Sequence, residues 1–301
     1  MKILVTGGLG FIGSWLMDSF LKNNDITIID KSSYKGKLEN KNVNFIKQDL
    51  SKECIFDKQD IVYHFAAFPD VRLSANDIRK VFDNNILATI NVLEACRKSD
   101  IKKILFASTS TVYGLKKGSI SETSELNPIS NYGASKIAGE NYIQMYSRLY
   151  GIQYVIIRYA NIFGPRSDHG VVWDLYHKLK KNPKELLILG NGLQNKSYLY
   201  ITDTIDATFL AAKQTNDIYN IGSDYQITVD SIAKIIIDEM GLENVTLKHT
   251  SSGKVAKGGW KGDVPSFLLD INKIKKLGWK PQTKTEEGIR KYVRWMVENK
   301  L

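Results

Sequence analysis

The chain has 301 residues, of which 43% are hydrophobic and 25% charged, a composition typical of a folded globular protein rather than a disordered or fibrous one. Its formal net charge is +10, but the lysines are scattered, so we expect a solvated surface and no nucleic-acid partner, with a polyanion-binding face as the alternative. No apolar run is long enough to span a membrane, and the two cysteines suit a reducing compartment, so we expect a cytoplasmic protein without a membrane partner.

Short apolar runs that are typical of strands alternate with helical patterns through the first half of the chain. The runs that predict strands are 3–6, 26–29, 43–46, 61–64, 103–107 and 153–157, and the patterns that predict helices are 11–22, 81–98 and 132–150. This alternation predicts an α/β fold, a doubly wound parallel sheet with helices on both faces.

The rhythm changes after about Asn161, where prolines and glycines separate shorter elements. We therefore expect a first domain over residues 1–161, to which later segments near 190–222 return. Residues 162–301 would mainly form a smaller α/β lobe. In open parallel sheets, ligands bind beyond the carboxyl ends of the strands, so we expect the site at that edge of the first domain.

Three glycines follow the first predicted strand in MKILVTGGLGFIGSWL, at Gly7, Gly10 and Gly13. A glycine turn between a strand and a helix lets the backbone approach a pyrophosphate, which the helix amides then face. The spacing is GxxGxxG rather than the commoner GxGxxG, and a simple tight turn is the alternative. In this context the run predicts a dinucleotide site.

Asp30 ends the second predicted strand about twenty residues farther on, where a carboxylate can accept hydrogen bonds from both ribose hydroxyls. Because an acidic residue repels a 2′-phosphate, Asp30 favours NAD over NADP, although Lys31 beside it weakens that preference. The alternatives are a turn residue at Asp30 and a strand-end cap at Asp49 in QDL.

Tyr132 and Lys136 are four residues apart at the start of a predicted helix, so their side chains share one face. A tyrosine ionises near pH 10 without help, so it needs a nearby ammonium and an oxidised nicotinamide to act as a base at neutral pH. Hydroxyls at 108–111 end the preceding strand and could orient a substrate alcohol. A solvated loop and a surface Tyr–Lys pair are the alternatives.

Taken in order, these motifs resemble the extended short-chain dehydrogenase/reductase family, and within it the nucleotide-sugar epimerases and dehydratases. The resemblance covers almost the whole chain. The segments that carry it are TGGLGFIGS, Asp30, QDL, HFAA, NNILATINVLEA, STSTVYG, YGASK, RYANIFGPR, YLYITDTIDA and LGWKP.

The resemblance implies a Rossmann-type domain that binds NAD, a smaller lobe that binds a nucleotide sugar, and a homodimer built from the helices near 81–98 and 132–150. Tyr132 would be the base, Lys136 would bind the nicotinamide ribose, and Thr109 would bind the sugar hydroxyl. The residues implied to contact NAD are Gly7, Gly10, Phe11, Ile12, Gly13, Asp30, Asp49, Leu50, Phe65, Ala66, Ala67, Tyr132 and Lys136.

For the substrate, the resemblance and the residue types together give Thr109, Ser110, Asn161, Lys196, Trp260 and Phe267 as contacts. Lys196 and Trp260 stand where the family commonly has arginines, so the diphosphate would depend on Lys196, Lys257 or Lys261. Phe267 falls where the family borders the sugar, with ordinary core packing as the alternative. The four histidines show no metal-ligand spacing, so no metal is expected, and His64 would end a strand near the cofactor.

Ser110 and Thr111 bear on the reaction, because the family's dehydratases have an Asp-Glu pair at these positions and its decarboxylases typically keep a glutamate. Neither hydroxyl can serve as a carboxyl acid or base. We therefore expect a 4-epimerase of the UDP-glucose/UDP-galactose type, with sugar and base open. The alternatives are a 4,6-dehydratase, a decarboxylase, an epimerase of uronic-acid or N-acetylhexosamine forms, or a non-catalytic NAD-binding regulator.

Overall fold

The computed structural model describes residues 1–21, 24–33, 42–52, 54–253, 258–260 and 262–301, and these form two compact units. Each unit combines segments that are distant in the sequence. The first unit consists of Met1–Val112, Pro128–Arg158 and Thr208–Tyr219, and the second of Tyr113–Asn127, Tyr159–Ala207 and Asn220–Leu301.

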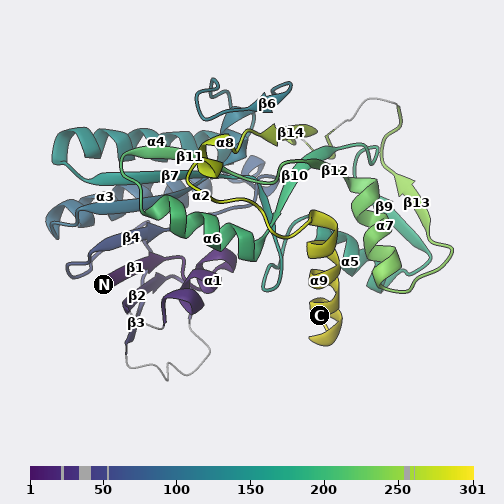
Figure 1. Ribbon diagram of the computed structural model, residues 1–301, viewed down its shortest axis with the longest axis horizontal. Helices are drawn as coiled ribbons and strands as arrows, with labels where there is room; N and C mark the ends of the chain where they lie inside the picture. The colour runs from purple at the N-terminus through teal and green to yellow at the C-terminus, as the bar shows by residue number, and fades with distance from the viewer. Residues whose placement is uncertain (22–23, 34–41, 53, 254–257, 261) are drawn as a thin grey trace. The chain divides into compact units, whose positions relative to one another are not determined.

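A seven-stranded sheet forms the centre of the first unit, in the order β11-β7-β5-β4-β1-β2-β3 (Figure 1). The five strands from β5 to β3 in this order pair in parallel. The strands are β1 (Lys2–Thr6), β2 (Asp25–Asp30), β3 (Val43–Lys47), β4 (Ile61–His64), β5 (Lys103–Thr109), β7 (Gln153–Tyr159) and β11 (Asp217–Ile221). The doubly wound, Rossmann-type sheet predicted from the sequence is confirmed.

Helices cover both faces of this sheet, as the alternation of side chains along β4 shows. Val62 packs in a cluster with residues of α3 and α4, whereas the ring of Tyr63 lies 5.0 Å from that of Phe20 on α1. Phe20 also contacts Phe209 of α6. The helices are α1 (Phe11–Phe20), α2 (Ile78–Val81), α3 (Ala88–Lys98), α4 (Asn131–Tyr150) and α6 (Ile201–Ala212), with a short 3-10 turn η1 (Leu73–Ala75).

The helix predicted over 81–98 is not continuous. It begins earlier, with α2, and a wide π-helical turn η2 (Phe82–Leu87) separates α2 from α3. Asn85 lies in this turn and is buried, and its carboxamide binds both the N–H and the carbonyl of Phe68. Asn85 thus ties the π-helical turn to the loop at Phe68, and hydrophobic spacing alone does not predict such a turn.

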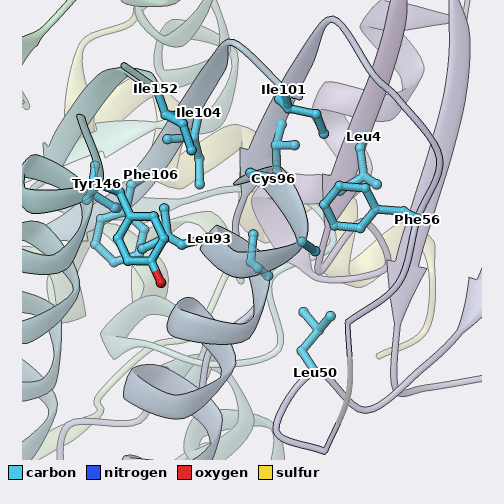
Figure 2. Packing of buried hydrophobic residues seen from close by; sticks show 14 of the residues in the cluster. Leu4, Leu50, Phe56, Leu93, Cys96, Ile101, Ile104, Phe106, Tyr146 and Ile152 are labelled. Atoms are coloured by element: carbon cyan, nitrogen blue, oxygen red, sulfur yellow. The ribbon is translucent and has the colours of Figure 1, made fainter. Parts of the chain in front are cut away.

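A cluster of buried side chains in the first unit lies between the sheet and helices α3 and α4 (Figure 2). Leu4 and Phe106 come from the sheet, Leu93 from α3 and Tyr146 from α4. Burying such side chains contributes about 1.5–3 kcal/mol each, so this cluster holds α3 and α4 against the sheet. Leu50, from the QDL motif, belongs to the same cluster.

The second unit contains a mixed sheet in the order β12-β10-β14-β6, with β8 also paired to β10, and a two-stranded sheet of β13 and β9. Helix α7 packs against both α5 and α9. The remaining elements are η3 (Ser110–Tyr113), β6 (Ser119–Ile120), β8 (Asn161–Phe163), α5 (Val171–Lys181), β9 (Glu185–Ile188), β10 (Asn195–Tyr200), β12 (Gln226–Thr228), α7 (Val229–Glu239), β13 (Thr246–His249), β14 (Ser266–Leu269), α8 (Asn272–Lys275) and α9 (Thr285–Glu298).

Candidate active site

The glycine loop packs so closely against its surroundings that side chains have no room there. Gly7 has a φ of 69°, and a Cβ on it would lie 2.7 Å from the Ala66 nitrogen. A Cβ on Gly13 would lie only 2.2 Å from the Gly7 carbonyl oxygen. Helix α1 therefore begins directly against the loop, and within the described residues no side chain caps it at Gly10. This cradle suits an anion at the helix N-terminus.

Asp30 is anchored to this loop. One carboxylate oxygen accepts a hydrogen bond from the Leu9 N–H at 3.2 Å, and the other accepts one from the Ser32 N–H at 2.9 Å. Asp49 accepts hydrogen bonds from the N–H and the hydroxyl of Ser51, and the hydroxyl bond is the main cause that lowers the pKa of Asp49. Both carboxylates thus accept hydrogen bonds from residues two positions later, as expected if they cap turns. Asp30 in addition binds the glycine loop at Leu9.

The HFAA run is tied to the end of β1 through His64. The Thr6 hydroxyl lies 2.7 Å from His64 Nδ1, and His64 Nε2 lies 3.0 Å from the Thr89 hydroxyl. The Thr89 hydroxyl is 2.6 Å from the Asn85 carbonyl, to which it donates, so it accepts from His64 Nε2–H. Burial, with help from Lys136, lowers the pKa of His64 to about 3. His64 is therefore a neutral connector between strand and helix.

Tyr132 lies in the first turn of α4, and several contacts fix that turn. The Ser130 hydroxyl accepts a hydrogen bond from the Gly133 N–H, which caps the helix. The Asn131 carboxamide donates to the Ser74 carbonyl at 2.8 Å. Ser135 accepts a hydrogen bond from Asn85 at 2.9 Å, which connects α4 to the π-helical turn.

Lys136 follows one helical turn later and is 3% exposed. Its Nζ donates to the Ala107 carbonyl of β5 at 2.8 Å and lies 5.9 Å from the centre of the Tyr132 ring. The structure thus brings Thr109, Tyr132 and Lys136 together within one unit, as the sequence predicts. Thr109 is 8% exposed, and its Oγ1 accepts hydrogen bonds from the N–H and the hydroxyl of Thr111.

Burial controls the electrostatics of these groups. It raises the pKa of Tyr132 to about 12, while a hydrogen bond with Thr109 acts in the opposite direction. Burial also lowers the pKa of Lys136 to about 7, and the Glu140 carboxylate opposes that shift. Because the protein alone does not lower the Tyr132 pKa, a positive charge brought by a bound ligand would favour its phenolate.

In the second unit, Lys196 and Phe267 are direct partners on strands β10 and β14. Lys196 Nζ lies 2.5 Å from Asp263 Oδ1 and 5.4 Å from the centre of the Trp260 ring. Phe267 is 7% exposed, and Asn161 begins β8, opposite Tyr198 of β10. Lys257 and Lys261 lie outside the described residues.

Three residues that the sequence analysis did not single out contribute here: Ser74, Asn85 and Asp263. Asp263 is 8% exposed, accepts from the Gly259 N–H at 2.8 Å, and pairs with Lys196. The sequence feature that could have indicated Asp263 is the charged residue after the last glycine in GGWKGD. Asn85 and Ser74 had no clear signal, because their roles depend on contacts with chain segments far away in the sequence.

Among the described residues, no cluster of histidine, cysteine or carboxylate side chains could hold a metal ion. No helix in the described part of the chain combines the length and apolar character needed to cross a membrane.

Residues 3–222 match the family model described as "NAD dependent epimerase/dehydratase family". The chain belongs to this family. Its cofactor is NAD, and the glycine loop fits that group, because the loop packs without side chains against the start of α1, whose N–H groups can face a pyrophosphate.

Relatives of full length include both epimerases and dehydratases. A Methanocaldococcus jannaschii protein, provisionally named a UDP-glucose 4-epimerase, is 38% identical over 99% of each chain. The UDP-glucose 4-epimerase of Thermotoga maritima, solved with UDP-glucose, is 31% identical with a TM-score of 0.86 over 100% of each chain. Human dTDP-D-glucose 4,6-dehydratase is 31% identical over 99% of this chain and 90% of its own.

Proposed function

We propose that this protein interconverts two nucleotide sugars that differ at C4, of the UDP-glucose/UDP-galactose type, through a transient 4-keto sugar. The observation that carries the proposal is the arrangement at the end of β5. Thr109 reaches the Tyr132–Lys136 face of α4, and the next two side chains are the hydroxyls of Ser110 and Thr111. This set can move a proton at an alcohol but offers no carboxyl group for the elimination of water.

The glycine loop would bind the cofactor's pyrophosphate at the start of α1, and the run after β4 would flank its nicotinamide half. Lys136 would bind the nicotinamide ribose, as the resemblance implies, and its Nζ lies 5.9 Å from the centre of the Tyr132 ring. Asp30 and the QDL segment would hold the adenosine half. When bound, NAD supplies a hydride acceptor that can return the same hydride.

Asp30→Ala is expected to reduce the preference for NAD over NADP. The wild-type carboxylate is held against the glycine loop at Leu9, so a 2′-phosphate there meets a like charge. We expect NAD to bind about tenfold or more tightly than NADP, because like charges at an interface cost several kcal/mol. Titration of both nucleotides measures this ratio. Asp25→Ala, an exposed carboxylate at the other end of β2, is the control. Equal affinities in the wild type would contradict the assignment.

In the reaction, the Tyr132 phenolate would accept the proton of the C4 hydroxyl while the hydride leaves C4. The Thr109 hydroxyl is positioned to orient the same alcohol, because it already hydrogen-bonds Tyr132. The Lys136 ammonium would stabilise the phenolate. After the ketone turns over in the site, return of the hydride to the other face gives the second epimer, and Tyr132 gives back the proton.

The second unit would bind the nucleotide portion of the substrate. Lys196 stands at a position where the family commonly has arginine, and the structure describes its surroundings. Its positive charge is already partly balanced by the Asp263 carboxylate. A diphosphate would therefore share Lys196 with a carboxylate, and lysine lacks the bidentate fork of arginine. Trp260, 38% exposed beside Lys196, offers a ring face to a base or sugar.

Phe267→Ser is expected to raise activity on N-acetylated substrates relative to plain hexoses. By resemblance Phe267 borders the sugar, where a bulky ring would exclude an N-acetyl group, and its side chain is nearly buried on the strand beside Lys196. The kcat/KM ratio for UDP-N-acetylglucosamine over UDP-glucose measures the effect. Phe163→Ser, which removes another buried ring from the same unit, is the control. If the ratio does not change, Phe267 is a core residue only.

The direct test is a panel of UDP-, GDP-, CDP- and dTDP-sugars incubated with the purified protein and NAD, without added reductant. The proposal predicts that at least one UDP-hexose reaches an equilibrium with its C4 epimer. Thermal shift with the same panel reports binding independently of turnover. Binding of NAD without conversion of any sugar would instead support the non-catalytic regulator.

A further inference from the structure

We propose that Glu140 is a positioning residue for Lys136: clamped by Arg158 and Ser108, its carboxylate keeps the Lys136 ammonium charged at the reacting end of α4. The inference rests on the proposed function, which gives Lys136 its task beside Tyr132.

Glu140 lies one helical turn beyond Lys136 on α4 and is 1% exposed. Arg158 of β7 donates to both of its carboxylate oxygens, from Nε at 3.0 Å and from Nη2 at 2.6 Å. The Ser108 hydroxyl of β5 also donates to Oε1. Side chains from two strands thus hold this carboxylate, and Ser108 directly precedes Thr109.

Arg158 is bound to this carboxylate, and Lys136 lies one helical turn from Glu140 on the same helix. Both cations are 3% exposed, and two buried positive charges without a counter-ion are costly. Burial lowers the pKa of Lys136 to about 7, and Glu140 is the group that raises it. Lys136 therefore sits close to losing its charge at neutral pH, and the Glu140 carboxylate opposes that loss.

The other groups around Lys136 do not replace Glu140. His64 of β4 is neutral, and the side chains of Tyr132 and Thr109 carry hydroxyls. From the neighbouring helices, Asp83 of η2 pairs with Arg79, and Glu94 of α3 pairs with Arg97 and accepts from Tyr146. Arg158 would repel Lys136 if Glu140 did not balance it.

A purely structural buried ion pair is the competing explanation. It predicts that removing the pair changes stability and lowers activity by the same factor at every pH. The proposed role predicts a change in pH dependence instead. Because Lys136 works as the ammonium, function should fall as the pH rises through its pKa, and a lower pKa moves that fall to lower pH.

The experiment compares wild type with Glu140→Gln and with the double variant Glu140→Gln/Arg158→Met, which removes both charges and leaves no lone buried arginine. NAD affinity, from tryptophan fluorescence, and sugar turnover are each measured from about pH 5.5 to 9.5. In Glu140→Gln we expect the high-pH fall of both quantities to move down by about one pH unit or more, and in the double variant by less, because Arg158 no longer repels Lys136. At pH values below the shifted fall, NAD affinity and turnover should return to within about threefold of wild type.

Glu94→Gln is the matched control, since it removes an ion-paired carboxylate of the same unit and should leave the profile in place. Lys136→Met should abolish the high-pH fall in NAD affinity. An unshifted high-pH fall in Glu140→Gln, or in the double variant if the single variant does not fold, would overturn the proposal, as would a wild-type profile that Lys136→Met does not alter. NAD affinity decides this even if no sugar is converted, so failure of the proposed function is seen separately.

Discussion

Tyr132→Phe is expected to cut turnover by about two to four orders of magnitude, the usual contribution of a positioned acid–base group. The substitution keeps the ring that packs in the first turn of α4 and removes only the oxygen that hydrogen-bonds Thr109. NAD affinity should change little, because the proposed cofactor contacts of the glycine loop are untouched. Steady-state kinetics and NAD titration on the same preparation measure both quantities.

Tyr142→Phe is the matched control for this variant. Tyr142 lies on the same helix and is 39% exposed, so loss of its hydroxyl should leave turnover within about twofold of wild type, as exposed substitutions usually do. Near-normal turnover of Tyr132→Phe would remove Tyr132 from the mechanism.

Gly13→Ala is expected to have the second large effect, on both cofactor binding and stability. Its Cβ would lie 2.2 Å from the Gly7 carbonyl oxygen, so the loop or α1 must shift. Overpacking of this kind costs about 1–3 kcal/mol of unfolding free energy. Because the displaced backbone is the proposed pyrophosphate cradle, NAD should bind at least about tenfold more weakly. Chemical denaturation and NAD titration measure the two losses.

Gly10→Ala separates a local clash from a general intolerance of side chains in the loop. A Cβ there would lie 3.2 Å from the same Gly7 oxygen, a contact that a small adjustment can relieve. We expect its losses to be clearly smaller than those of Gly13→Ala. Equal losses for the two variants would contradict the close-approach explanation.

Most of the first unit could be predicted because its signals are local. An apolar run such as Ile3–Val5 is buried on both faces of a parallel sheet, and such runs are easy to recognise. The π-helical turn at Asn85 could not be predicted, since hydrophobic spacing does not distinguish it from regular α-helix and the bonds of Asn85 to Phe68 form only in the folded chain. The sequence predicts that later segments near 190–222 return to the first domain, but the extents of the exchanged segments, such as Thr208–Tyr219, depend on packing rather than on local pattern.

The proximity of Tyr132 and Lys136 could be predicted from their spacing, because residues four apart share one face of a helix. The Ser108–Glu140–Arg158 network could not, as it joins α4 to two strands that only the folded sheet brings near. In the second unit, the ion pair between Lys196 and Asp263 could not be predicted either. It depends on the pairing of β10 with β14, the strand that follows Asp263 in the chain. The expected homodimer stays a prediction.

The proposed reaction is a transient oxidation at C4 with return of the same hydrogen. Incubation of the protein with NAD and a UDP-hexose in deuterated water, followed by proton NMR of the products, distinguishes it from dehydration. We expect two C4 epimers with no carbon-bound deuterium, no carbon dioxide and no net NADH. Deuterium at C5 together with a 6-deoxy product would contradict it, because that outcome requires an acid–base pair other than the hydroxyls of Ser110 and Thr111.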